Sequence, residues 1–265
     1  MNTKIAVIGC GNLGLSIVEG FIRAKVGAHV TTTRRNTETI EYLSEKGVKV
    51  TSDNAYAIKN SKIILLALKP YRILSVIDEL KEHFTSEHII VSLATGVSLE
   101  ELKEHVGNNV QVFRAMPNVA ASVGQSATCI SKNGADKDKE ALKELEKVFK
   151  LIGETILINE ELMESAVVLG ACGTAFALRF IRAMSQAGVQ IGFSSKTATQ
   201  IANQTVKGAA EILLATGNHP EAEIDKVATP KGITITGLNE MEHQGFSAAL
   251  IRGMLTAYKK IEDSK

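Results

Sequence analysis

The sequence has 265 residues, 45% hydrophobic and 22% charged, which is typical of an ordinary globular protein. The formal net charge of +1 excludes a global field that would attract nucleic acid or an anionic membrane. The uncharged apolar stretch 165–178 is shorter than the roughly 20 residues that span a bilayer, and no signal peptide is visible. Three widely spaced cysteines and six scattered histidines show no disulfide or metal-ligand pattern, so we expect a cytoplasmic protein without a metal.

Short apolar runs alternate with helical patterns over the first part of the chain. The runs are IAVIG, HVTTT, KIILLALKP, HIIVSLA, VQVFRAMP and TILI. Continuous apolar strands separated by helices predict an α/β fold, a doubly wound sheet of the Rossmann type with helices on both faces. After Asn159 the strand patterns stop, and helical spacing is broken at 188–195, 217–220, Pro230 and Gly245. We therefore predict a dinucleotide-binding domain over 1–159 and an all-helical domain over 160–265.

A glycine-rich turn follows the first predicted strand. Gly9, Gly11 and Gly14 form G-x-G-x-x-G, with Asn12 and Leu13 between the last two glycines. This motif is weak evidence alone, but here it lies between a strand and a helix, as dinucleotide binding requires. Gly9 allows the tight turn, Gly11 lets backbone approach a pyrophosphate, and Gly14 lets helix and strand pack closely. A glycine turn without a ligand is the less favoured alternative.

The end of the second predicted strand bears on the choice of cofactor. NAD enzymes usually carry Asp or Glu there, whereas this chain has Thr33, Arg34 and Arg35. Guanidinium groups bind phosphate oxygens in bidentate fashion, so the sequence favours NADPH over NADH, with NADH still possible. Either arginine is a candidate for the 2'-phosphate, and an ordinary solvated loop is the alternative for both.

Later strand ends supply the rest of the expected cofactor cleft, because ligands bind beyond the carboxyl ends of strands in an open parallel sheet. Lys69 is expected to face a phosphate or a substrate carboxylate, or else to be a solvated loop charge. Asn118 is expected either to anchor a turn or to contact the nicotinamide. The remaining expected cofactor residues are Asn54, Ala67, Pro70, Ala94 and Gly96.

A second chemical motif lies near the C-terminus, in IDKVATPKGITITGLNEMEHQGFSAALI over 224–251. We predict a helix start with Thr229 as the N-cap and Pro230 in the first turn. Backbone N–H groups around Gly232, Ile233 and Thr234 would then be available to a carboxylate. On spacing alone, a capped helix start without a ligand is equally acceptable.

The chain resembles pyrroline-5-carboxylate reductases over nearly its whole length. The resemblance rests on IAVIGCGNLG, LALKP, SLATG, RAMPN with the following Gly124, QAGVQIGFSSKTATQIANQTVKGAA and TPKGITITGLNEMEHQGFSAALI, in that order. It implies NAD(P)H-dependent reduction of the cyclic imine L-1-pyrroline-5-carboxylate to L-proline, the last step of proline biosynthesis. It further implies that Thr234 hydrogen-bonds the substrate nitrogen and that backbone N–H groups of Gly232, Ile233 and Thr234 bind the substrate carboxylate.

Two stretches depart from the family pattern. The family usually has Ser-Gly-Ser-Gly-Pro-Ala-Tyr where this chain has GACGTAF over 170–176, and Pro-Gly-Gly where it has Pro230, Lys231 and Gly232. Small residues are retained, but hydroxyl groups are lost and a lysine side chain is added. The alternatives are therefore a non-catalytic NADPH-binding protein of the same fold, or a reductase for another cyclic imine. Cys172 replaces a family serine and is expected to be a packing thiol.

The helical region carries more apolar surface than a short helical bundle can bury by itself. Its apolar stripes include Leu162, Ala166 and Leu169, and further along Leu250, Met254 and Leu255. In the family this region interlocks two subunits, and the active site lies where the dinucleotide domain of one subunit meets the helices of its neighbour. The resemblance thus implies a homodimer, or a larger ring of dimers.

Overall fold

A computed structural model describes residues 3–107, 109–132 and 139–263. The chain forms two compact units: the first contains residues 1–174 with the C-terminal 260–265, and the second contains residues 175–259. The all-helical region begins earlier than the second unit, because the last strand ends at Asn159. The predicted functional boundary at residue 160 stays a prediction.

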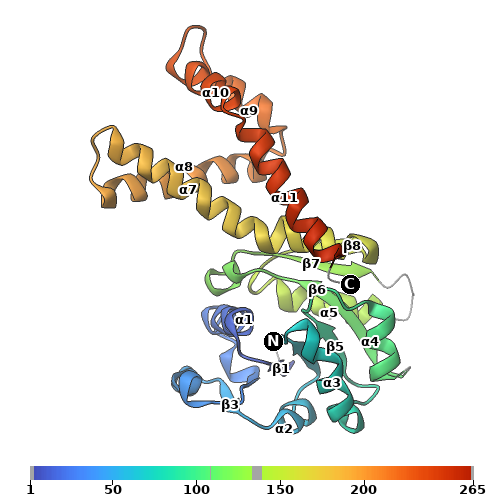
Figure 1. Cartoon of the computed structure of the whole chain (residues 1–265). Helices are drawn as coiled ribbons and strands as arrows, with labels where there is room; N and C mark the ends of the chain where they lie inside the picture. Colours follow the sequence, from blue (N-terminus) through green and yellow to red (C-terminus); the bar gives the residue numbers. More distant parts are fainter. Residues whose placement is uncertain (1–2, 108, 133–138, 264–265) are drawn as a thin grey trace. The chain divides into compact units, whose positions relative to one another are not determined.

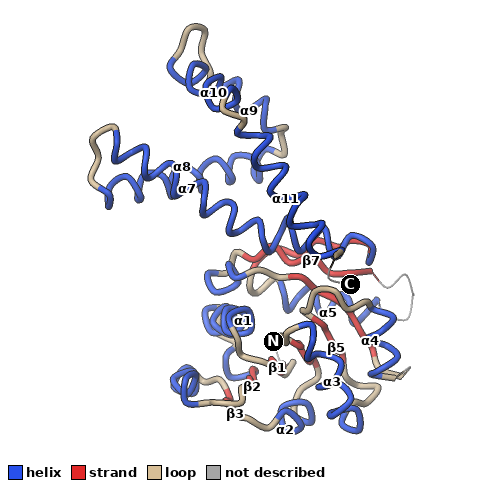
Figure 2. Tube along the Cα trace, in the orientation of Figure 1, coloured by secondary structure: helices blue, strands red, loops and turns tan. Residues whose placement is uncertain are grey.

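The first unit is built on an eight-stranded sheet with the order β3-β2-β1-β4-β5-β6-β7-β8. Neighbouring strands from β3 to β6 are parallel, and the order reverses direction along the sheet between β1 and β4. This is the predicted doubly wound, Rossmann-type sheet, visible in Figures 1 and 2. The strands are β1 (Ile5–Ile8), β2 (Val30–Thr33), β3 (Lys49–Thr51), β4 (Ile63–Leu66), β5 (Ile89–Ser92), β6 (Gln111–Met116), β7 (Ser126–Lys132) and β8 (Gly153–Asn159).

Side chains alternate between two apolar clusters along each central strand, as a sheet covered on both faces requires. In β1, Ile5 and Val7 belong to one cluster, and Ala6 and Ile8 belong to the other. The first cluster packs under α1 (Asn12–Arg23), η2 (Glu38–Lys46) and α5 (Lys139–Phe149), and the second packs under α2 (Asn54–Lys59), α3 (Pro70–Leu80) and α4 (Leu99–Val106). Short turns η1 (Gly27–His29), η3 (Lys81–His83) and η4 (Val119–Val123) complete the connections.

The far edge of the sheet runs the other way. Strand β7 pairs with β6 in antiparallel fashion, and β8 pairs with β7 in parallel. Neither β3 nor β7 was among the predicted strands, because KVT and SATCISK lack the continuous apolar run of a doubly buried strand. Strand β8 therefore runs opposite to β1–β6.

After β8 the chain forms one helical stretch: η6 (Glu160–Leu162), α6 (Met163–Ala166), the π-helical turn η7 (Val167–Cys172) and α7 (Gly173–Gln190). Its start is anchored by Arg114 of β6, which is 3% exposed and donates to Glu160 at 2.7 Å and to Glu164 at 3.1 Å. A buried arginine needs such partners because an unpaired charge is costly inside a protein.

The second unit is entirely helical over its described residues, as predicted. It contains most of α7 and then α8 (Ser195–Thr216), α9 (Pro220–Val227), α10 (Ile233–His243) and most of α11 (Phe246–Glu262). Gly188 of α7 lets Ala198 of α8 approach, since an added Cβ would lie 2.9 Å from the Ala198 Cβ. Phe180 of α7 and Phe246 of α11 pack against each other with tilted rings, whose centroids are 6.0 Å apart.

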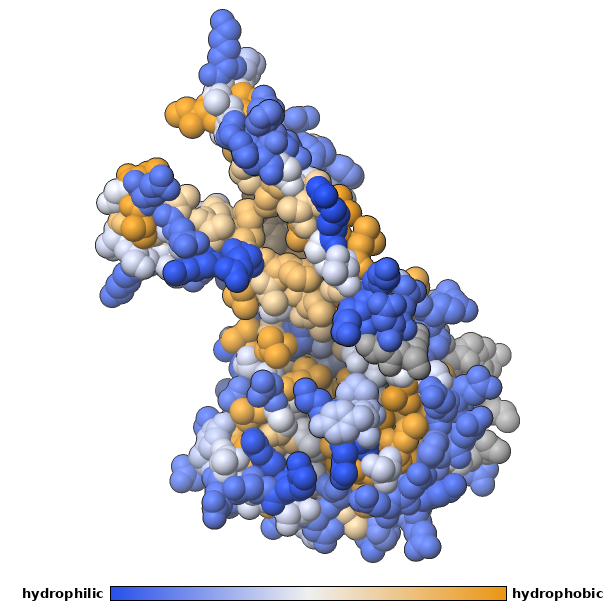
Figure 3. Space-filling model, viewed as in Figure 1, coloured by the Kyte–Doolittle hydropathy of each residue, from blue (hydrophilic) through white to orange (hydrophobic). Residues whose placement is uncertain are grey.

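Apolar side chains on these helices are largely open to solvent. Leu214 is 79% exposed, Leu255 is 62% exposed and Leu178 is 60% exposed. Figure 3 shows apolar residues gathered on the visible faces of the helices. Among the described residues, the stretch 160–190 is also long and apolar enough to cross a membrane, judged by length and composition alone.

The helix start near the C-terminus differs from the prediction. The N-cap of α10 is Gly232, not Thr229, and Pro230 precedes the helix. The Thr229 carbonyl accepts the Gly232 N–H at 2.9 Å, so Thr229 closes a turn before the helix. Lys231 occupies the left-handed region with φ of 58°, and the turn it makes delays the start of the helix.

Candidate cofactor and substrate site

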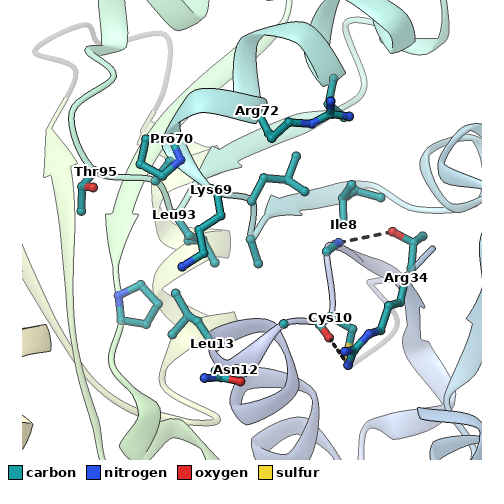
Figure 4. A pocket seen from close by; sticks show the side chains of 18 of the residues that line it. Ile8, Cys10, Asn12, Leu13, Arg34, Lys69, Pro70, Arg72, Leu93 and Thr95 are labelled. Atoms are coloured by element: carbon teal, nitrogen blue, oxygen red, sulfur yellow. Dashed lines mark hydrogen bonds between the residues drawn. The ribbon is translucent and has the colours of Figure 1, made fainter. Parts of the chain in front are cut away.

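A cleft with a volume of about 830 Å³ lies at the carboxyl ends of the parallel strands in the first unit. Strand order places it at the reversal between β1 and β4, where open α/β sheets bind ligands. Thirteen of the fifteen expected cofactor residues line it: Gly9, Gly11, Asn12, Leu13, Thr33, Arg34, Arg35, Asn54, Ala67, Lys69, Pro70, Ala94 and Asn118. Figure 4 shows side chains from several strand ends facing this common space.

The three glycines of the turn differ in what the fold demands of them. Gly9 has φ of 96°, and a Cβ there would lie 2.7 Å from the Ala67 carbonyl oxygen. Gly14 lies under the turn instead of lining the cleft, and its Cβ would lie 2.3 Å from the Gly9 carbonyl oxygen. A Cβ added at Gly11 would meet no atom within 4 Å, and its φ of −82° is open to any residue. Packing therefore requires Gly9 and Gly14, whereas Gly11 leaves an unfilled space beside the cleft.

Gly11 is also the N-cap of α1, and no side chain caps this helix. The first N–H groups of α1 therefore remain available at the cleft, together with the positive end of the helix dipole. An unfilled glycine beside uncapped N–H groups is what a dinucleotide pyrophosphate needs in order to approach the backbone. These residues thus fit a dinucleotide cofactor.

Residues after β2 are tied to the glycine turn by hydrogen bonds. The Gly9 N–H donates to the Thr33 hydroxyl at 3.3 Å, and the Arg34 guanidinium donates to the Cys10 carbonyl at 3.1 Å (Figure 4). Arg34 is thereby held at the cleft with further N–H donors to spare, because a guanidinium has five. Arg35 lines the same cleft. Both predicted arginines are therefore in place, and the choice between them stays open.

Cys10 lies in the glycine turn but is buried, with 1% exposure. Burial raises the pKa of the Cys10 thiol above its usual range, and the hydrogen bond with Thr32 only partly offsets this. A reactive cysteine needs a lowered pKa and solvent access. This environment fits a small packing residue and not a nucleophile.

Lys69 and Pro70 lie where β4 leads into α3. Lys69 is the N-cap of α3, and Pro70 is its first residue. In Figure 4 the Lys69 side chain points into the space that Asn12 and Leu13 also face. The interpretation of Lys69 as a cation at the cleft is thus favoured over a solvated loop charge.

The polar groups of Asn118 hold the loop after β6 in place through hydrogen bonds within the chain. Its backbone N–H donates to the Ser126 hydroxyl at 3.0 Å, and its side-chain oxygen accepts the Ala120 N–H at 3.0 Å, which caps η4. Its side-chain amide donates to the Gly170 carbonyl in η7 at 3.1 Å. Of the two sequence-based interpretations, the turn anchor is the one with observed contacts.

Sequence reasoning missed several residues of the cleft wall, among them two in η7. Val167 and Ala171, both in η7, line the cleft near Met116 and Asn118. Their sequence is small and apolar without any motif, so it gave no signal of a binding role. The π-helical geometry that brings them to the cleft is not visible in the sequence.

Gly96 does not line this cleft. It lines a smaller cavity of about 310 Å³ with Arg114 and the carboxylates Glu101, Glu160, Glu161 and Glu164. This placement separates Gly96 from the other expected cofactor residues, whereas its neighbour Ala94 remains in the cleft.

The expected substrate residues belong to the second unit. Gly232 is tightly packed, since a Cβ there would lie 2.3 Å from the Thr229 hydroxyl oxygen. Ile233 is 95% exposed at the first position of α10. Within the part of the chain that the structure describes, the Thr236 hydroxyl donates to the Gly232 carbonyl at 3.1 Å, while no bond engages the Thr234 hydroxyl. Thr234 thus presents a free hydroxyl beside an uncapped helix start.

Two family models match the chain. Residues 160–264 match the model described as pyrroline-5-carboxylate reductase dimerisation. Residues 4–96 match the model described as NADP oxidoreductase, coenzyme F420-dependent. The first model covers the helical region, and the second covers the glycine turn and the strands that follow it.

Three curated relatives with full-length or partial matches are described as pyrroline-5-carboxylate reductases. The chain is 42% identical to pyrroline-5-carboxylate reductase 1 of Dictyostelium discoideum, but it spans only 49% of that protein's length. It is 40% identical to reductase 2 of the same organism, over all of this chain and 94% of the relative. It is 30% identical to the Escherichia coli reductase over 99% of this chain and 98% of the relative.

Solved structures agree with the sequence comparisons. A Plasmodium falciparum pyrroline carboxylate reductase with NADP bound is 25% identical with a TM-score of 0.86, over 99% of this chain and 98% of that one. A pyrroline-5-carboxylate reductase from Coxiella burnetii is 28% identical with the same TM-score and the same coverage of both chains.

Proposed function

The chain belongs to the pyrroline-5-carboxylate reductase family, and from this premise we propose that it reduces L-1-pyrroline-5-carboxylate to L-proline with NADPH. The observation that carries the proposal is the cleft, where an unfilled glycine, an uncapped helix start and two arginines meet. NADPH, when bound, supplies the hydride that the imine carbon receives. Every other task falls to residues of this chain.

The cofactor tasks divide along the cleft. N–H groups at the start of α1 bind the pyrophosphate beside Gly11. Arg34, held by the Cys10 carbonyl, and Arg35 provide the positive charge that a 2'-phosphate requires. Lys69 adds a further cation at the strand end. This distribution of charge favours NADPH over NADH.

The substrate tasks fall to the start of α10. N–H groups at Gly232, Ile233 and Thr234 bind the substrate carboxylate, and the Thr234 hydroxyl hydrogen-bonds the ring nitrogen. A hydroxyl both donates and accepts, so it suits the imine and the amine product alike. A substrate that enters as an iminium needs no strong acid, and orientation is then the main contribution to rate.

The test follows NADPH absorbance with pyrroline-5-carboxylate and, in parallel, with the six-membered cyclic imine. Turnover of the five-membered imine with the higher kcat/KM supports the proposal. Exclusive turnover of the six-membered imine would assign another reductase activity, and no oxidation with either would indicate a non-catalytic NADPH-binding protein.

Thr234→Ala should lower kcat/KM by about 10- to 100-fold, because a hydrogen bond to a charged or polar reacting group contributes about 1.5–3 kcal/mol. Thr236→Ala is the matched control, since it removes a hydroxyl from the same helix that is already bonded to Gly232. Equal losses in the two variants would remove the role assigned to Thr234.

We further propose that the chain acts in the cytoplasm as a homodimer or a ring of dimers. The family model over 160–264 describes dimerisation, and it includes the whole stretch with membrane-spanning length. A second subunit therefore accounts for the exposed apolar helices without a bilayer. Sedimentation in buffer without detergent should give a mass of two chains or a multiple of two.

A further inference from the structure

The π-helical turn η7 has a carbonyl group, that of Gly170, which accepts hydrogen bonds from side chains. Two side chains donate to this group: the Asn118 amide reaches the Gly170 carbonyl at 3.1 Å, and the Thr174 hydroxyl reaches it at 3.3 Å. Asn118 is only 8% exposed, so its bond is largely protected from water. The turn is thus held from β6 on one side and from α7 on the other.

The turn has an apolar face toward the cofactor cleft. Val167 and Ala171 lie about one turn apart and both line the cleft, as does Met116 at the end of β6. Val167 and Ala171 also pack in one apolar cluster with Met116 and Met163. The wall they form is therefore fixed from behind by packing and from the side by Asn118.

Strand order says which part of a dinucleotide this wall would meet. The arginines follow β2, on one side of β1, whereas Asn118 follows β6, on the other side beyond β4 and β5. A dinucleotide whose pyrophosphate lies at α1 crosses the sheet between these sides. With the adenosine phosphate at the arginines, the nicotinamide lies toward β6 and η7.

We propose that Asn118 is a positioning residue, which holds η7 so that Val167 and Ala171 orient the nicotinamide ring for hydride transfer. This inference rests on the proposed binding of NADPH but requires no imine substrate. Asn118 acts through the turn and not by a bond to the ring, because both polar groups of its side chain are already engaged.

Asn118→Asp isolates the contact, because a carboxylate still accepts the Ala120 N–H but cannot donate to the Gly170 carbonyl. We expect kcat to fall about ten-fold, while the Kd for NADPH changes by less than about three-fold, since phosphate contacts provide most of the affinity. Fluorescence of bound NADPH without substrate should change in intensity, and amide exchange over 167–174 should accelerate. Ser122→Ala is the control, since its hydroxyl bonds only the nearby Val119 carbonyl and should leave all readouts unchanged.

Thr174→Val keeps the proposal testable if the aspartate variant does not fold. It removes the second donor to Gly170, and it should lower kcat and alter NADPH fluorescence in the same direction but less, whereas Thr174→Ser should restore both. Unchanged fluorescence and exchange in a folded variant would overturn the inference. A loss of NADPH affinity as large as the loss of kcat would also overturn it, because it would mark a general structural defect. If the parent binds NADPH but reduces no imine, the fluorescence and exchange readouts still decide.

Discussion

At the residue scale, the glycine turn separates fold from function. Gly9 and Gly14 are required by contacts within the chain, whereas Gly11 faces space that the chain itself leaves unfilled. The motif alone could not reveal this difference, because all three glycines look equivalent in the sequence.

Gly11→Ala should raise the Kd for NADPH by at least about ten-fold, because a methyl group occupies the approach of the pyrophosphate. Its urea midpoint should stay close to that of the parent, since no atom lies within 4 Å of the added Cβ. Gly14→Ala is the contrasting variant and should lower the midpoint sharply. Fluorescence titration with NADPH and urea unfolding measure the two effects, and equal unfolding losses in both variants would contradict this division.

Lys231 combines a departure from the family with an unfavourable backbone conformation. It is one of two non-glycine residues with positive φ among the described residues, and the family has glycine there. Lys231→Gly should therefore stabilise the chain by up to about 1 kcal/mol, measured as a higher melting temperature.

The same variant reports on the substrate site. If the Lys231 ammonium assists the substrate carboxylate, Lys231→Gly raises the KM for the imine and reduces its dependence on salt, while the KM for NADPH stays constant. Lys231→Asn tolerates positive φ without the charge and should share the altered KM. A lower KM in both variants would show that the lysine obstructs the site.

At the scale of elements, the start of α4 has a reciprocal cap. The Ser98 hydroxyl accepts the Glu101 N–H at 3.2 Å, and the Glu101 carboxylate accepts the Ser98 N–H at 2.7 Å. Hydrogen bonds from the Ser98 side chain and then its backbone lower the pKa of Glu101 below its usual range. The carboxylate half of this cap is therefore strongest while Glu101 is ionised, whereas the bond from the Glu101 N–H to the Ser98 hydroxyl does not depend on ionisation.

Ser98→Ala should lower the free energy of unfolding by about 1 kcal/mol at pH 7. Because the pKa of Glu101 is lower in the folded chain, its contribution is present above about pH 4.3 and is lost as the pH falls through the folded pKa. The difference between parent and variant should thus shrink in urea titrations at pH 3.5. A difference that grows toward acid would contradict this role of the carboxylate.

Elements differ in how much of them the sequence could predict. Apolar runs predict the central strands, and glycines and prolines predict the breaks between helices. The structure confirms both. The helix start at Gly232 was misplaced because Thr229 and Pro230 form a convincing cap pattern, yet the left-handed Lys231 intervenes. The π-helical turn had no local signal, and one of the side chains that bonds it, Asn118, lies 52 positions away in the chain.

At the scale of the whole molecule, the exposed helices predict dependence on assembly. Leu255→Glu places a charge on an apolar face and should shift the protein toward single chains, with a melting temperature that depends more on concentration. Lys196→Glu introduces the same charge at an exposed polar position of α8 and should leave the mass unchanged. Sedimentation velocity checks both, and an unaltered mass for Leu255→Glu would exclude this residue from the interface.

The connection between β8 and η7 is short. From the end of β8 at Asn159 to the start of η7 at Val167, the chain has only residues 160–166. Each helical residue turns the chain by about 100°, so one inserted residue in this interval would rotate Val167 and Ala171 away from the cleft. The ion pairs of Arg114 with Glu160 and Glu164 fix where this stretch begins. An inserted residue could therefore not be accommodated at its start without breaking these ion pairs. The number of residues in this connection therefore determines which side chains of η7 face the cleft.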